Sequence, residues 1–178
     1  MNRLKWMTCI LLCAMGLAWT ASAAPTSFET TLHDAEGKDV GNVKLTQLEQ
    51  GVKIDLQVRN LPPGQHAFHV HEVGKCTGPD FKSAGDHFSP SERKHGFNTA
   101  GGPHAGDMPN LIVKSDGTVS LEIINSNITL SKGANSLFKP GGTALVIHSR
   151  PDDHVTQPSG DAGDRIACAE IKAKWQQK

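Results

Sequence analysis

The sequence predicts an all-β protein, an eight-stranded Greek-key sandwich or barrel that carries two long functional loops. Eight segments alternate apolar or β-branched residues with polar ones at a period of two, which is the pattern of half-buried antiparallel strands. Turn signals rich in glycine and proline lie between these segments, and no long segment shows a helical stripe. This many short strands in one modest chain is typical of a sandwich or barrel closed by Greek-key connections.

Two long loops interrupt the expected series of strands. In chain order the strands are expected at residues 27–35, 40–49, 52–59, 66–72, 110–115, 118–126, 143–149 and 166–172. Residues 73–109 and 150–165 are instead rich in Gly, Pro, His and Asp and show no sustained strand pattern. Long stretches without regular structure inside a compact domain are usually functional or disordered. We therefore expect these two loops to carry the function.

Residues 1–23 have the features of a secretory signal peptide. Arg3 and Lys5 precede an apolar run from Trp6 to Trp19, and Ala21-Ser22-Ala23 supplies the small residues of a cleavage site. The apolar run is too short for a comfortable membrane span, although an uncleaved anchor is the alternative interpretation. Cleavage after Ala23 would leave residues 24–178 as one domain, with no membrane attachment and with the periplasm as its destination.

Charge and cysteine content narrow the class of protein. The whole chain has 18 basic and 18 acidic residues, and removing the signal takes away Arg3 and Lys5, which leaves 16 against 18. A nucleic-acid-binding protein would show a basic face, so no nucleic-acid partner is expected. Of the four cysteines, only Cys76 and Cys168 lie beyond the signal. Two cysteines in an exported chain are most simply one disulfide.

Three histidines are placed to meet on one face of the predicted sheet. His69 and His71 lie two residues apart in an apolar strand, so both imidazoles project from the same face. His148 ends another apolar strand, from which it can turn toward a common site. Three imidazoles on a rigid sheet suit copper, which binds nitrogen tightly and cycles between two oxidation states.

The loop at residues 73–109 holds a second candidate ligand set. Three imidazoles and one carboxylate form a good tetrahedral zinc site, and the loop supplies His87, His95, His104 and Asp107. Seven candidate ligands are one too few for two separate four-coordinate metals, but sharing His87 gives each metal four. Asp152 is expected to accept hydrogen bonds from ligand imidazoles of both sites, which would fix the orientation of their rings. His66 is a weaker candidate for a metal role, and His33 and His154 are expected to be solvated.

Four motifs, which span most of the mature chain, resemble those of the copper–zinc superoxide dismutase family in its bacterial secreted branch. They are Gly64-Gln-His-Ala-Phe-His-Val-His71, Ser83-Ala-Gly-Asp-His87-Phe, His104-Ala-Gly-Asp107-Met-Pro-Asn110, and Gln157-Pro-Ser-Gly160 followed by Arg165-Ile-Ala-Cys168. The resemblance implies dismutation of superoxide to dioxygen and hydrogen peroxide by a copper ion that is alternately reduced and reoxidised. A structural zinc ion would share one histidine with the copper.

The resemblance also implies a role for each site residue. Copper is expected at His69, His71, His87 and His148, and zinc at His87, His95, His104 and Asp107. Arg165 is expected to guide and hold superoxide beside copper, and His87 to leave reduced copper while it carries a proton. Cys76 and Cys168 match the disulfide of the family. Family members occur as monomers and as dimers, and the sequence leaves a homodimer open because no apolar stripe marks an interface.

Several residues depart from the family pattern. Asp86 precedes the shared histidine where Gly or Pro is frequent, Asp164 precedes Arg165 where Gly is frequent, and Asp161 adds a further carboxylate. Carboxylates that reach the substrate channel would weaken its attraction for an anion by a modest, screened amount. His154 adds a group that titrates near neutral pH, so the rate and its pH profile depend on which of these side chains face the channel.

Two other functions compete with the enzyme. A periplasmic copper or zinc buffer would bind the metals without turnover, but it has little need for Arg165 or for a shared ligand. Copper carriers also often use methionine, and only Met108 lies beyond the signal. A structural sandwich that holds zinc alone would not need His148 and the His69/His71 pair to converge on His87.

Overall fold

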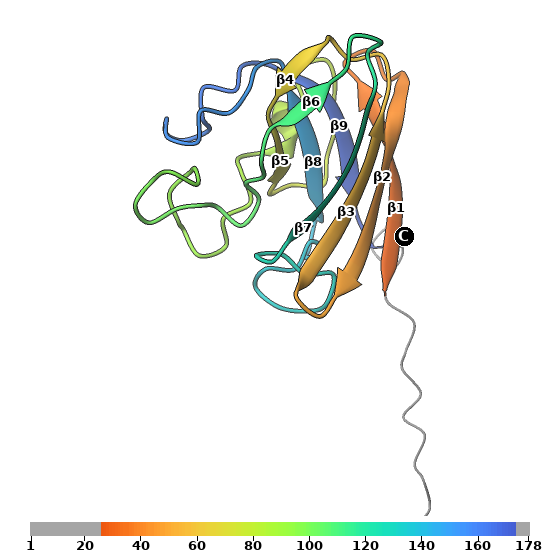
Figure 1. Cartoon of the computed structure of the whole chain (residues 1–178). Helices are drawn as coiled ribbons and strands as arrows, with labels where there is room; N and C mark the ends of the chain where they lie inside the picture. Colours follow the sequence, from red (N-terminus) through yellow and green to blue (C-terminus); the bar gives the residue numbers. More distant parts are fainter. Residues whose placement is uncertain (1–25, 174–178) are drawn as a thin grey trace, which may run out of the picture.

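The computed structural model describes residues 26–173, which form an almost entirely β structure (Figure 1). A single short 3₁₀ turn, η1, lies at Lys82–Ala84. The strands are β1 (Ser27–Asp34), β2 (Asp39–Leu48), β3 (Gly51–Val58), β4 (Gly64–His66), β5 (Phe68–His71), β6 (Leu111–Val113), β7 (Val119–Asn125), β8 (Thr143–His148) and β9 (Arg165–Ile171). The all-β class is therefore confirmed. Among residues 26–173 there is no helix long and apolar enough to cross a membrane.

The strands form a curled antiparallel sheet. Seven of them are hydrogen-bonded in the order β5-β8-β9-β1-β2-β3-β7, and β4 pairs with β6. Because β6 also contacts β7, the short β4–β6 ribbon brings the two ends of the larger sheet toward each other (Figure 1). The result is the Greek-key barrel that the sequence predicts.

The predicted strand at residues 66–72 is divided in two. His66 pairs with Leu111 of β6, whereas Phe68 pairs with Ile147 of β8. Ala67 lies at the change of partner, where its N–H donates to the carbonyl of Arg150 and its own carbonyl accepts from the N–H of His148. This division explains why nine strands are observed where eight were expected.

Strands β5 and β8 are buried on both faces. The side chains of Phe68, Val70, Leu145 and Ile147 belong to the core inside the barrel. On the opposite face, Ala144 and Val146 of β8 pack with Phe81 and Ala84 of the loop between β5 and β6. Because both of its faces are buried, β8 has a nearly continuous apolar sequence instead of an alternating one. It also means that His69 and His71 point into a space that the loop covers.

The two predicted loops are present, between β5 and β6 and between β8 and β9, and they project from the same side of the barrel (Figure 1). A third long connection, residues 126–142, joins β7 to β8 and corresponds to the stretch between the predicted strands 118–126 and 143–149. It is packed rather than solvated, because Ile128, Leu130 and Leu137 are buried in the main core. The side-chain carbonyl of Gln47 also accepts from the N–H of Leu130 at 2.6 Å.

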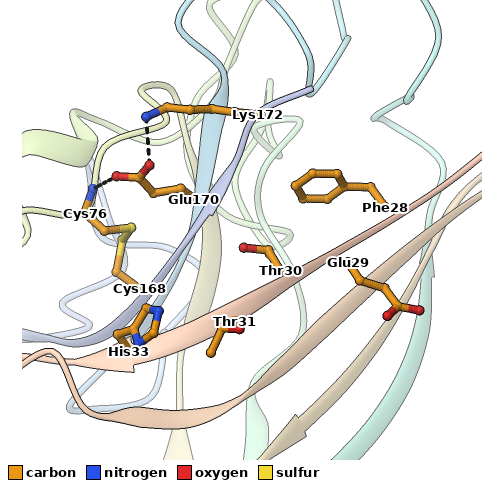
Figure 2. Close-up of a pocket in the computed structure, with 9 residues that line it drawn as sticks. All are labelled: Phe28, Glu29, Thr30, Thr31, His33, Cys76, Cys168, Glu170 and Lys172. Atoms are coloured by element: carbon orange, nitrogen blue, oxygen red, sulfur yellow. Dashed lines mark hydrogen bonds and ion pairs between the residues drawn. A yellow bond between two sulfur atoms is a disulfide. The ribbon is translucent and has the colours of Figure 1, made fainter. Parts of the chain in front are cut away.

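A disulfide joins the first loop to the last strand. Cys76 is bonded to Cys168 of β9, as the sequence predicts, and the N–H of Cys76 donates to Glu170 at 2.9 Å. Strand β1 pairs with β9 only at His33 and Asp34, so the two strands separate further along. A cavity of about 520 Å³ fills the gap, with the disulfide on one wall (Figure 2). The disulfide therefore anchors the loop where strand pairing is incomplete.

Candidate metal centre

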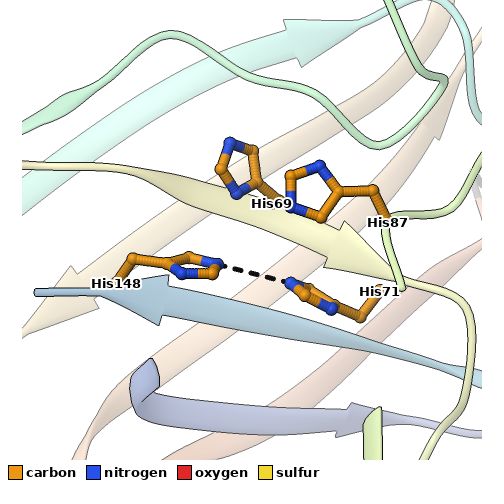
Figure 3. A group of neighbouring side chains, drawn as sticks. All are labelled: His69, His71, His87 and His148. Carbon is orange, nitrogen blue, oxygen red and sulfur yellow. Dashed lines mark hydrogen bonds between the residues drawn. The ribbon is translucent and has the colours of Figure 1, made fainter. Parts of the chain in front are cut away.

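Four histidines meet on the outer face of β5 and β8. His69 and His71 project from β5, His148 from the end of β8, and His87 from the loop that covers them (Figure 3). Each offers one ring nitrogen within 4.8 Å of the others, and all four residues are buried. The ring centroids of His69 and His87 are 4.0 Å apart. The period of two in β5 thus places its imidazoles where His148 and His87 can reach them.

The outer nitrogens of these rings are bound to fixed acceptors. His71 Nδ1 lies 2.9 Å from the carbonyl oxygen of Gly85, and His69 Nε2 lies 2.8 Å from Asp152 Oδ2. His148 Nδ1 lies 3.5 Å from the carbonyl oxygen of Gly163. A carbonyl or carboxylate oxygen can only accept, so each of these nitrogens carries the proton. In a neutral ring the inner nitrogen then carries a lone pair, and the lone pairs of the neighbouring rings face one another.

Two of the inner nitrogens have no hydrogen-bond partner at all. His69 Nδ1 and His87 Nε2 are buried and unsatisfied, and His71 Nε2 faces His148 Nε2 at 3.3 Å. Burying a polar atom without a partner is unfavourable, and so is the approach of two lone pairs. A cation among the four nitrogens would satisfy all of them. This donor set fits copper, because imidazole nitrogen is a ligand that copper binds tightly.

The second group is built around one carboxylate. Asp107 Oδ1 lies 3.1 Å from Nδ1 of both His87 and His95 and 3.4 Å from Nδ1 of His104. The other oxygen, Oδ2, accepts from the N–H of Gly96 and of His104, at 2.8 and 3.0 Å. The carboxylate is therefore held in place by the backbone while Oδ1 faces three imidazoles. Three nitrogens and one oxygen in this arrangement fit zinc.

Asp152 connects the two groups. One of its oxygens lies 2.8 Å from His69 Nε2, and the other lies 2.9 Å from His95 Nε2. The loop from β8 to β9 approaches this carboxylate so closely that a Cβ atom at Gly160 would lie 1.8 Å from Asp152 Oδ1. Gly160 also has a φ of +72°, a conformation that glycine adopts without strain. Glycine is thus required at this position for the bridge between the two groups.

Burial and charge set the protonation of the centre in opposite ways. Burial lowers the pKa of His69 and His71, and it lowers the pKa of His87 to about 3 and of His148 to about 2. Burial disfavours a charge on His95 as well, but hydrogen bonds to Asp107 and Asp152 outweigh it and raise the pKa of His95 to about 9. The two carboxylates therefore favour the charged form of His95.

Arg165 lies beside the four-histidine group. It stands at the start of β9, where its guanidinium donates to the carbonyls of Phe81 and Gly85, both at 2.8 Å. The carbonyl of Gly85 also accepts from His71, so one loop oxygen positions both side chains. Arg165, His87 and His148 line a cavity of about 370 Å³ that opens to solvent. A small anion in this cavity would share its walls with the guanidinium and two histidines of the group.

The structure brings together all seven predicted ligands, with Asp152 and Arg165 beside them. It also shows two residues that hold the backbone of site residues and that were not predicted from the sequence. Asn110 binds the backbone of Asp152 through two hydrogen bonds of 2.8 Å. Gln157 binds the N–H and the carbonyl of His95, each at 2.9 Å. Both residues lie in the quoted motifs, which was the available signal for them.

The remaining histidines lie outside the two metal groups. His66 is buried, and its ring nitrogens each lie 2.8 Å from a backbone carbonyl, that of Pro62 and that of His148. It therefore fixes the backbone of a site histidine. His33 is exposed on β1, as expected. His154 was expected to be solvated, but it is only partly exposed, because it packs on Phe97 and lies 3.3 Å from Asp152.

Comparison with known proteins identifies the family. The family model for copper/zinc superoxide dismutase matches residues 40–171. The chain belongs to the copper/zinc superoxide dismutase family. It is 52% identical over 139 residues to superoxide dismutase [Cu-Zn] 1 of Aquifex aeolicus, covering 77% of this chain and 82% of the relative. It is 43% identical over 141 residues to superoxide dismutase [Cu-Zn] of Caulobacter vibrioides, covering 77% of this chain and 80% of the relative.

Solved structures of this family agree with the fold. A double mutant of a superoxide dismutase-like protein from Bacillus subtilis has a TM-score of 0.80 and 40% identity, covering 82% of this chain and 97% of that one. Copper and zinc are the cofactors of the family, and the two histidine groups supply one ligand set suited to each. The family assignment and the donor chemistry thus agree.

Replacing Asp152 by asparagine is expected to weaken both metals at once. The amide can accept from one imidazole, but its NH₂ group then faces the N–H of the other, so one ring loses its orientation. Losing such a supporting partner typically lowers metal affinity about 10- to 100-fold. Competition titrations with a chelator would measure copper and zinc affinities separately. Asp153→Asn, an exposed neighbour, is the matched control, and equal affinities in the two variants would contradict the bridging role.

Proposed function

We propose that this protein dismutates superoxide, with copper held by His69, His71, His87 and His148 and zinc by His87, His95, His104 and Asp107. The observation that carries the proposal is the position of His87. Its Nε2 belongs to the first group and is buried without a partner, while its Nδ1 lies 3.1 Å from Asp107 in the second. A metal buffer or a zinc-only protein has no need for one imidazole with a nitrogen in each group.

A copper ion held by the four histidines would supply the redox chemistry, the transfer of an electron from one superoxide to the next. The residues around it do the rest. Arg165 holds the small anion in the cavity with a guanidinium that its two backbone contacts keep in place. His87 Nε2 is the nitrogen that can carry a proton toward the developing peroxide. A zinc ion held by His87, His95, His104 and Asp107 would keep the ring of His87 oriented.

We also propose that the enzyme works in the periplasm. Residues 1–23, the predicted signal peptide, lie outside the described residues, and residues 24–178 would form the exported dismutase domain. The Cys76–Cys168 disulfide supports export, because disulfides form and persist in oxidising compartments. Superoxide is the expected substrate there.

The direct test of the proposed activity is superoxide decay measured with the metal-free protein, the zinc-loaded protein and the protein loaded with copper and zinc. Activity is expected only with copper. Tight copper binding without any decay of superoxide would support a metal buffer instead. Equal activity with zinc alone would contradict the assignment of the redox site.

Replacing Arg165 by glutamine is expected to lower kcat/KM about tenfold, the effect of removing one charge close to the substrate in a partly screened site. The fall of the rate with rising salt should disappear as well, because that fall reports attraction of the anion. Stopped-flow measurements across ionic strength would test both effects. Arg150→Gln is the matched control, since Arg150 is exposed and paired with Asp161 at 2.8 Å. An unchanged rate would make Arg165 an ordinary structural arginine.

A further inference from the structure

The cavity beside the histidines contains one carboxylate that opposes Arg165. Among its lining residues only Arg165 and Asp86 carry full charges, because the imidazoles that line it are ligands or neighbours of the metal groups. Asp86 is exposed and acts electrostatically on the guanidinium of Arg165. The charges of these two side chains cancel at a distance, although each acts separately on an anion inside the cavity.

The other acidic residues that depart from the family pattern do not line this cavity. Asp161 forms an ion pair with Arg150 at 2.8 Å, which neutralises it locally. Asp164 is exposed, its N–H is bound by the hydroxyl of Ser149, and its side chain is not part of the cavity wall. The sequence indicates three carboxylates that could face the channel, and of these only Asp86 lines the cavity.

A fixed negative charge on the cavity wall discriminates among anions by their charge. A monoanion meets the repulsion of Asp86 once, whereas a dianion of similar size meets it twice at the same position. A small monoanion that enters the cavity still meets Arg165 and the histidines that line it. Dianions such as hydrogen phosphate are abundant in cells and would compete for the same guanidinium, because arginine binds phosphate oxygens well.

We propose that Asp86 is a charge filter, a specificity-determining residue that admits the superoxide monoanion and disfavours dianions at Arg165. This inference rests on the proposed function, since it assigns the substrate to this cavity. Two unit charges about 7 Å apart in a medium with the dielectric constant of water interact by about RT, which corresponds to roughly a threefold change in binding. The same repulsion on a dianion gives roughly a ninefold change.

The test compares azide and inorganic phosphate as probes of the protein loaded with copper and zinc. Azide binding is followed by the change it causes in the copper absorption spectrum, and phosphate binding by its competition with azide, at low ionic strength and pH 8. The Asp86→Asn variant is expected to bind azide about threefold and phosphate about ninefold more tightly. Both gains should shrink as salt is added.

The matched control is Asp164→Asn, which removes the same charge one residue from Arg165 but outside the cavity wall. Equal gains in the two variants, or equal gains for azide and phosphate in Asp86→Asn, would overturn the filter. Azide affinity unchanged by Asp86→Asn would also overturn it and would leave the copper site intact. Failure of azide to alter the spectrum of the unchanged protein would overturn the copper assignment and the filter together.

Discussion

Replacing His148 by alanine is expected to abolish copper binding and dismutation while leaving zinc in place. His148 supplies one of the four nitrogens of the first group from a rigid strand, and the group among the described residues holds no fifth ligand. The loss of copper affinity should exceed about 100-fold, which is the upper end of the effect of losing a supporting partner alone. The zinc ligands belong to the loop between β5 and β6, so their geometry does not depend on His148.

Metal analysis after dialysis against both ions, combined with superoxide decay, would measure this outcome. His33→Ala is the control, because it removes an exposed imidazole from β1 that belongs to neither metal group. Turnover equal to that of the unchanged protein would remove His148 from the copper site. Simultaneous loss of zinc would show that the two groups are less independent than their positions indicate.

Replacing Cys76 by serine is expected to lower the free energy of unfolding by about 4–5 kcal/mol. The disulfide joins residues 92 positions apart, and the chain-entropy model gives this magnitude for a closed loop of about that length. A local effect is expected as well. The same loop carries Phe81 and Gly85, whose carbonyls position Arg165, so loosening it should lower activity before the protein unfolds.

Denaturant unfolding would measure the stability, and limited proteolysis of the folded protein would report the loop. The double variant, with Cys76 and Cys168 both changed to serine, controls for an unpaired buried thiol. Lower stability with unchanged proteolysis and activity would confine the disulfide to a general stabilising role. Unchanged stability would contradict the contribution of loop closure.

The strand pattern could be predicted because burial on one face imposes a period of two. Strands β2 and β3 lie within a residue of the expected 40–49 and 52–59. The division of the fourth strand at Ala67 could not be predicted in this way. The alternation continues through it, and the change of partner depends on contacts with Arg150 and His148, more than eighty residues later in the chain.

The ligands could be predicted because metals require particular atoms in fixed numbers, so seven residues had a chemical reason to converge. The residues that support them have no such constraint. Asn110 and Gln157 act through backbone contacts whose geometry depends on the path of two loops. Likewise, the sequence offered Asp86, Asp161 and Asp164 as equal candidates, and only the loop conformation separates the carboxylate at the cavity from the one paired with Arg150.

His87 is proposed to be shared by two different metals. Anomalous diffraction from crystals of the protein loaded with copper and zinc, recorded at both absorption edges, tests it most directly. A copper peak is expected among His69, His71, His87 and His148, and a zinc peak among His87, His95, His104 and Asp107, with the His87 ring between them in the oxidised protein. One metal alone, zinc at both positions, or a His87 ring that contacts only one metal in that state would contradict the shared ligand.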